Sequence, residues 1–163
     1  MGITLNADEI FEIAEQIERN GAKFYRAAAE KFSAVRQTLV ALAADEDEHL
    51  KTFQAMRTQL KSSEQQPDVF DPDGQAQMYL RAMADGHIFD IKADPAEKLA
   101  SQETVEDILK MALGIERDSI AYYVGLKDYV PVKAGRDKVE DVIRQEMKHI
   151  AILNEKLAAL KRS

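Results

Sequence analysis

The sequence has no cysteine among its 163 residues. Disulfides, thiolate zinc sites and cysteine-ligated iron–sulfur clusters are therefore excluded, and any metal must be held by nitrogen and oxygen ligands. Glycine and proline are also scarce, at seven and four residues, and the prolines and most of the glycines fall outside the long stretches of helical periodicity. Together with the many Ala, Leu, Glu and Lys residues, this pattern predicts an all-α protein.

Two further absences concern location and partners. No apolar run approaches the roughly 20 residues that span a bilayer, and the N-terminal MGITLNADEIFEI lacks the basic and apolar regions of a signal peptide. We therefore expect a cytoplasmic protein. The net charge of −7, from 22 basic and 29 acidic residues, creates no field that would attract nucleic acid or an anionic membrane. Neither is expected as a partner.

Apolar residues recur at intervals of three and four and predict four long helices. The expected helices cover about residues 7–31, 34–61, 102–129 and 136–160. Asn6 and Glu9 have the spacing of a capping box at the start of the first helix. Between about residues 62 and 101, Pro67, the DPDG segment and Pro95 interrupt the pattern and leave room for short helices near 75–84 and 95–100.

The connections between the long helices favour one topology. Only a tight turn separates the first two, and the VPVKAG segment at residues 130–135 separates the last two, so each pair should form an antiparallel hairpin. The roughly 40 residues between the hairpins are enough to cross the length of a bundle. Short loop, long crossover, short loop is the connectivity of ferritin-like bundles. We expect residues 1–163 to form one such domain, with the crossover between the second and third long helices.

The two halves of the sequence carry the same polar pattern. Glu18-x-x-Gly21-x-x-Phe24-Tyr25 returns as Glu116-x-x-Ser119-x-x-Tyr122-Tyr123 at an offset of 98, and Glu46-x-x-His49 returns as Glu146-x-x-His149 at an offset of 100. Two hairpins related by a pseudo-twofold axis would bring these side chains to one level at the centre of the bundle. One Glu and one Glu-x-x-His pair from each half predict a binuclear metal site.

The surroundings of each glutamate in the repeat support this interpretation. A solvated carboxylate should have polar neighbours on its helix face, yet Glu46 is flanked by Leu42 and Leu50. Buried carboxylates need protons, cationic partners or metal ions, and no Lys or Arg stands on these stripes at the matching level. Two divalent cations would balance four carboxylates. The predicted ligands are Glu18, Glu46, His49, Glu116, Glu146 and His149, a donor set that suits two iron ions or manganese and permits zinc.

Each of these six residues, taken singly, has an ordinary explanation as a solvated glutamate or a structural histidine. The joint pattern favours metal binding, because two of the chain's three histidines occupy equivalent places in the repeat. The third, His87, has no partner motif, and we expect it to be structural or exposed. In the DEDEH run, Asp45 should lie on the solvated side of its helix and could also contact a metal-binding side chain.

Tyr25 and Tyr123 lie two turns beyond Glu18 and Glu116 on the same helix faces. They could hydrogen-bond a ligand carboxylate, take part in electron transfer, or be ordinary core aromatics. We favour a role in orienting the carboxylates over a redox role.

The motif-bearing segments resemble the ferritin-like superfamily and, within it, rubrerythrin-like proteins. They are EQIERNGAKFY (15–25), LAADEDEHLKTF (42–53), ALGIERDSIAYY (112–123) and IRQEMKHIAIL (143–153). The resemblance implies a non-haem di-iron centre that reacts with hydrogen peroxide or dioxygen and cycles between diferrous and diferric states. It also implies that Glu46 and Glu146 bridge the irons, that His49 and His149 each bind one, and that Glu18 and Glu116 are terminal ligands.

The chain departs from rubrerythrins in two respects. Without cysteine it cannot contain the rubredoxin-type domain that serves them as electron donor. Rubrerythrins also have an additional carboxylate and a Glu-x-x-Glu in the fourth helix, whereas here Leu113 stands three residues before Glu116 and the fourth helix has Glu-x-x-His. The symmetric set of six ligands resembles bacterioferritin-type centres, which leaves ferroxidase or oxidase activity open beside peroxidase turnover.

The sequence is compatible with three functions. The first is a di-iron oxidoreductase that removes peroxide or dioxygen in oxidative-stress defence, with a small-molecule oxidant and an electron donor that the sequence does not identify. The second is a ferroxidase or iron-storage protein, which would require a hollow assembly. The third, a structural module without metal, is disfavoured by the complete ligand set. The resemblance also implies a homodimer or a higher homo-oligomer.

Overall fold

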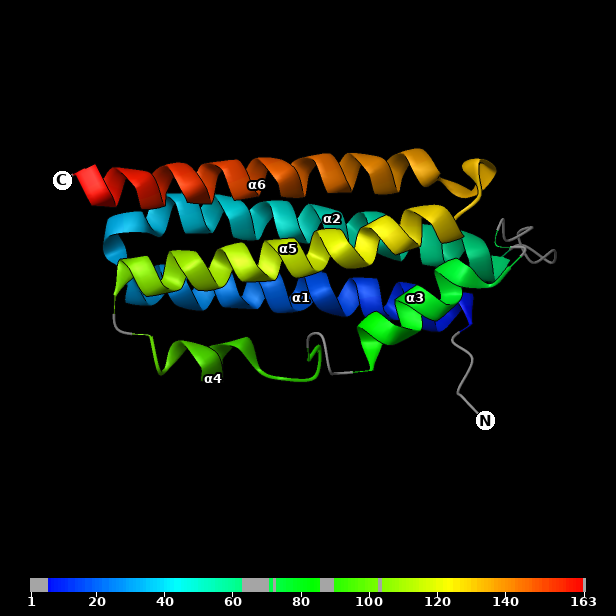
Figure 1. Cartoon of the computed structure of the whole chain (residues 1–163), viewed down its shortest axis with the longest axis horizontal. Coiled ribbons are helices and arrows are strands. Elements are labelled where there is room, and N and C mark those ends of the chain that lie inside the picture. The colour runs from blue at the N-terminus through cyan, green and yellow to red at the C-terminus, as the bar shows by residue number, and fades with distance from the viewer. Residues whose placement is uncertain (1–5, 63–70, 72, 86–89, 103, 163) are drawn as a thin grey trace.

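Four long helices run side by side along the length of the molecule (Figure 1). They are α1 (Ala7–Lys31), α2 (Arg36–Ser62), α5 (Val105–Tyr129) and α6 (Arg136–Arg162). Two shorter helices, α3 (Gln75–Ala84) and α4 (Pro95–Leu99), lie in the segment that connects α2 to α5. The computed structural model describes residues 6–62, 71, 73–85, 90–102 and 104–162, and this part of the chain contains no strand.

Local signals in the sequence explain where the helices begin. Asn6 Oδ1 accepts the backbone N–H of Glu9 at 2.8 Å, and the backbone N–H of Asn6 donates to Glu9 Oε2 at 2.8 Å, so the predicted capping box is confirmed. Thr104 Oγ1 caps α5 by accepting the N–H of Asp107 at 3.1 Å. A short 3₁₀ turn, η1 (Ser33–Val35), precedes α2 and tightens the connection from α1.

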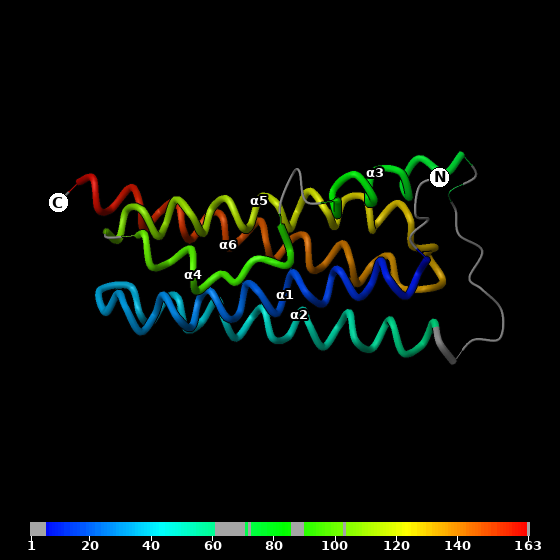
Figure 2. Tube along the Cα trace, turned by 90° about the horizontal axis from the view of Figure 1, so that it is seen from below, coloured from blue at the N-terminus to red at the C-terminus, as the bar shows by residue number. Residues whose placement is uncertain are grey.

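The helices form two antiparallel hairpins. Figure 2 shows α1 and α2 on one side of the bundle and α5 and α6 on the other. The second hairpin turns through η2 (Val132–Ala134) and Gly135, whose φ of 104° lies in the left-handed region that favours glycine. The crossover returns along the bundle, with α3 near the end of α2 and α4 nearer the start of α5 (Figure 1), so α2 and α5 run in the same direction. This is the predicted connectivity.

The apolar core is divided into two clusters, one toward each end of the bundle. Each of the four long helices contributes to both. The first cluster includes Ile10, Phe53, Tyr122 and Val139, and the second includes Phe24, Leu39, Ile108 and Leu153. Between the clusters, the same helices bury titratable side chains, and this polar layer is the candidate functional site.

The crossover is held against the bundle by polar contacts and by close packing. Asn20 Nδ2 donates to the carbonyl oxygen of Ile91 at 2.8 Å, and the ring of Tyr79 packs against Gly125 of α5.

Among the helices of the described part, none combines the length and the apolar character needed to cross a membrane.

Gly125→Ala is expected to lower the free energy of unfolding, because the new methyl group would lie 2.6 Å from Cε1 of Tyr79. Overpacking of this kind costs roughly 1–3 kcal/mol, whereas alanine gains only about 1 kcal/mol over glycine in a helix. Gly114→Ala is the matched control, because its nearest neighbour, in Arg117, would be 3.8 Å away. Urea unfolding followed by circular dichroism should rank Gly114→Ala as the more stable; the reverse order would contradict the packing.

Candidate metal centre

The six predicted ligand side chains come together in the layer between the two apolar clusters. Each is at most 2% exposed. Helix α1 supplies Glu18, α2 supplies Glu46 and His49, α5 supplies Glu116, and α6 supplies Glu146 and His149. Helical spacing of three residues turns the Glu and His of each Glu-x-x-His pair toward the same side, which places both in the centre of the bundle.

The donor atoms of these side chains form two groups. One group is Glu18, Glu46, His49 and Glu146, and the other is Glu46, Glu116, Glu146 and His149. Within each group the donor atoms lie within 4.8 Å of one another. Glu46 and Glu146 belong to both groups, so each of these carboxylates is placed between two potential cation positions.

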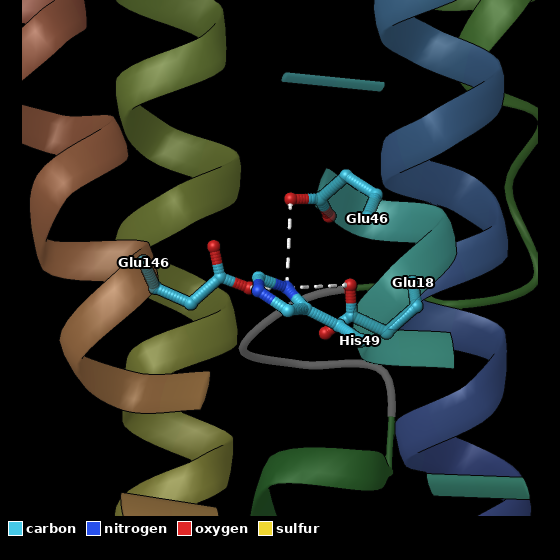
Figure 3. Close-up of side chains that lie close together, drawn as sticks. All are labelled: Glu18, Glu46, His49 and Glu146. Atoms are coloured by element: carbon cyan, nitrogen blue, oxygen red, sulfur yellow. Dashed lines mark ion pairs between the residues drawn. The ribbon is translucent and has the colours of Figure 1, made fainter. Parts of the chain in front are cut away.

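Both imidazoles turn Nδ1 toward the carboxylates. His49 Nδ1 lies 3.3 Å from Glu146 Oε1 and 3.4 Å from Glu18 Oε2 (Figure 3). His149 Nδ1 lies 2.9 Å from Glu146 Oε2 and 3.3 Å from Glu46 Oε1. The two rings stack with their centroids 5.7 Å apart. Nδ1 is therefore the nitrogen that each histidine directs into the cluster.

The other nitrogen of each imidazole faces an oxygen acceptor on the opposite hairpin. His49 Nε2 lies 2.9 Å from Gln145 Oε1, and His149 Nε2 lies 3.1 Å from Asp45 Oδ2. These acceptors favour the tautomer that carries its proton on Nε2, which leaves the Nδ1 lone pair directed into the cluster. Asp45 thus contacts His149, one of the predicted ligands.

Two buried tyrosines fix the outer carboxylates. Tyr25 of α1 donates a hydrogen bond to Glu116 Oε1, and Tyr123 of α5 donates one to Glu18 Oε1. Burial, followed by the nearby carboxylates, raises the pKa of both tyrosines well above the usual value, so the hydroxyls stay protonated donors. Each of these hydrogen bonds crosses from one hairpin to the other, and both are contacts of the kind that an orienting role requires.

Several atoms of the cluster are buried without a hydrogen-bond partner in the described part of the chain. They are Glu18 Oε2, Glu46 Oε1, His49 Nδ1, Glu116 Oε2, both carboxylate oxygens of Glu146, and His149 Nδ1. Unsatisfied buried polar atoms are rare in proteins because each costs about 1–3 kcal/mol. Seven of them facing one another indicate that the site is built for cations.

Lys and Arg side chains do not supply the positive charge that this cluster needs. No ion pair joins the six residues to a described Lys or Arg. The contrast with Glu15, the other buried carboxylate of the described residues, is clear, since Arg57 Nη1 lies 2.7 Å from Glu15 Oε2. Among the described residues, the one buried carboxylate outside the cluster thus has a cationic partner.

Without a metal, protons offset part of the buried charge. Burial raises the pKa of Glu18 and Glu46, and it raises the pKa of Glu116 to about 8. Burial also opposes charging of His49, but contacts with Glu146 and Glu18 outweigh it and raise the pKa of His49 to about 10. Contacts with His149 and His49 outweigh burial at Glu146 and lower its pKa to about 2. Metal ions must therefore displace protons.

Metal binding is expected to release protons and to tighten as pH rises from 6 to 8. His49 and Glu116 have pKa values of about 10 and about 8, so both are mainly protonated at pH 7 and must lose their protons to bind a cation. The apparent affinity should rise roughly tenfold per pH unit for each proton released. Co(II) titrations with an indicator dye in weak buffer measure both quantities. A pH-independent affinity without proton release would contradict these protonation states.

Gly21 is a site residue whose role the sequence did not reveal. A Cβ atom at this position would collide with Glu46 Oε2, so the absence of a side chain makes room for the shared carboxylate. The only signal was its place in the repeat, opposite Ser119.

Gln145 was missed as well, although it stands one residue before Glu146 as Asp45 stands before Glu46. His87 lies outside the described residues.

Gly21→Ala is expected to weaken metal binding because the methyl group would push the Glu46 carboxylate out of its place. Gly114→Ala, also within a long helix, is the control, since its new methyl group meets no atom closer than 3.8 Å. Isothermal titration with Co(II) should show a loss of at least about tenfold in affinity for Gly21→Ala and none for the control. Equal affinities would show that the contact between Gly21 and Glu46 does not shape the site.

Comparison with known proteins bears on both the fold and the site. No protein-family model and no curated protein matches the sequence. A solved structure from Thermotoga maritima, provisionally described as a ferritin-like diiron-carboxylate protein, matches with a TM-score of 0.72 at 25% sequence identity, over 97% of this chain and 98% of that chain. This chain has the ferritin-like fold. The predicted four-helix bundle with a long crossover is thereby confirmed.

The ferritin-like fold and the buried cluster together support a metal site. Di-iron and di-manganese carboxylate proteins of this fold place a Glu from each of two helices and a Glu-x-x-His pair from each of the other two at the bundle centre. The six side chains described above are such a set, and they lie together in the central layer of this bundle.

Proposed function

We propose that this protein is a non-haem di-iron oxidoreductase that reduces hydrogen peroxide or dioxygen in defence against oxidative stress. The observation that carries the proposal is the pair of donor groups that share Glu46 and Glu146. In this assignment the two shared carboxylates would serve both ions. Glu18 and His49 would complete one position, and Glu116 and His149 would complete the other.

The donor set is compatible with iron, and the structural similarity to a diiron-carboxylate protein favours iron over the alternatives. Carboxylate and imidazole ligands suit iron and manganese and permit zinc, and the Thermotoga maritima protein is described as a diiron-carboxylate protein. When bound, two adjacent irons supply the two electrons that cleavage of the O–O bond in peroxide requires. The separate rubrerythrin-like assignment rests on the sequence motifs alone.

The protein's own residues would hold, orient and shield this centre. Tyr25 and Tyr123 donate to one oxygen of Glu116 and Glu18 and leave the second oxygen of each carboxylate for a cation. The apolar clusters on both sides exclude bulk water from the layer. Because the chain has no cysteine, it cannot contain a rubredoxin-type iron site, and we expect reducing equivalents to come from an external donor.

A ferroxidase or iron-handling function is the second candidate. It is favoured by the symmetry of the site, in which each half contributes one Glu-x-x-His pair as in bacterioferritin-type centres. This function would require assembly into a hollow particle. A homodimer or higher homo-oligomer and a cytoplasmic location remain predictions from the sequence.

The purified protein, loaded anaerobically with Fe(II), should retain about two irons per chain. The double variant Glu46→Gln, Glu146→Gln should retain almost none, because both positions lose their shared ligands. Glu48→Gln, Glu155→Gln is the matched control, since it makes the same change at exposed positions of the same two helices. Elemental analysis measures the content. A parent that binds no iron would refute the proposed centre.

The same loaded protein separates the two candidate functions. The oxidoreductase function would be supported if hydrogen peroxide oxidises the bound Fe(II) stoichiometrically and the protein retains no further iron. Accumulation of many ferric ions per chain in a large particle, measured by light scattering and elemental analysis after repeated Fe(II) addition in air, would support iron storage.

A further inference from the structure

The two halves of the repeat differ at the residues that contact the two buried histidines. The offset of 100 that relates Glu46 to Glu146 also relates Asp45 to Gln145. Asp45 Oδ2 lies 3.1 Å from His149 Nε2, whereas Gln145 Oε1 lies 2.9 Å from His49 Nε2. One imidazole is therefore supported by a negatively charged oxygen and the other by a neutral amide oxygen.

We propose that this difference makes the two metal positions unequal, so that the position at His149 binds a divalent cation more tightly and fills first. The inference rests on the proposed binuclear site. When Nδ1 binds a cation, the ring becomes more positive and its Nε2–H becomes a stronger donor. A carboxylate accepts such a hydrogen bond about twice as strongly as a neutral oxygen, which makes His149 the better ligand.

The remaining donors of the two positions are closely matched, which isolates this difference. Each group contains three carboxylates and one imidazole. Glu18 and Glu116 each accept a hydrogen bond from a tyrosine of the other hairpin. The contact of Glu46 with Gly21 does not separate the positions, because Glu46 belongs to both groups.

Solvent limits the size of the effect. The Asp45 side chain is 53% exposed, so water screens part of its charge. Groups that support a metal-binding histidine typically alter affinity by 10–100-fold. We therefore expect a difference near the lower end of this range, about tenfold between the two positions. The consequence is ordered loading, with one firmly held ion at His149 and one more exchangeable ion at His49.

Co(II) titration of the whole chain, followed by visible absorption and calorimetry, tests the order of binding. The parent should bind two equivalents in separable steps. Asp45→Asn should weaken the tighter step about tenfold and merge the two. Gln145→Glu should instead tighten the weaker step by a similar factor. Glu48→Gln removes one charge from the same helix at an exposed position that pairs with Lys51, and it should leave both steps unchanged.

A second measurement identifies which histidine binds first without relying on affinity. In protein labelled with ¹⁵N-histidine, one equivalent of Zn(II) should shift Nδ1 of His149 before that of His49. Only three histidines are present, so a His49→Gln variant and a His87→Gln variant assign the signals. In Gln145→Glu the preference for His149 should disappear.

The possible outcomes are distinct. Two equal steps in the parent, simultaneous shifts of both histidines, or first binding at His49 would overturn the inference and leave the binuclear site intact. Equal weakening by Asp45→Asn and Glu48→Gln would overturn it too, because the effect would then be one of general charge. No binding of Co(II), Zn(II) or iron by the parent would overturn both this inference and the proposed function.

Discussion

The burial of four carboxylates and two imidazoles in one layer is the constraint on which the rest of this structure depends. Charges in a protein interior are costly unless they are paired, protonated or bound to metal. Arg57 pairs with the buried Glu15, but no comparable cation reaches the central layer in the described residues. Protons on His49 and Glu116 offset part of the charge in the absence of metal. The remaining charge is the reason that this layer suits metal ions.

The ferritin-like topology is what makes such a layer possible. Because the crossover lets each hairpin present the same motif to the other, two equivalent halves face one another across the bundle. The stabilising contacts cross between the halves. Tyr25 supports Glu116, and Tyr123 supports Glu18, so neither hairpin can position its outer carboxylate alone. The pairing of the two hairpins therefore both stabilises this polar layer and sets the geometry of the site.

The approximate twofold symmetry of the site fails at the residues that contact Nε2 of the two histidines. Around the shared carboxylates the two halves agree, but Asp45 and Gln145 differ in charge while making equivalent contacts with His149 and His49. In the proposed binuclear centre, the two ions would therefore be held differently through groups that do not touch them. In a redox or iron-handling protein, such a difference would decide which ion stays and which exchanges.

The sequence by itself determined the long helices, the capping box at Asn6 and the six clustered side chains. The reason is geometric, since helical periodicity converts spacing along the chain into position on a helix face. The tertiary structure decided which residues meet across the bundle. The bond from Tyr25 to Glu116 joins residues 91 apart and the contact of Asp45 with His149 joins residues 104 apart. Such contacts, like the space that Gly21 leaves for Glu46, depend on how the helices pack, and no local pattern encodes that packing.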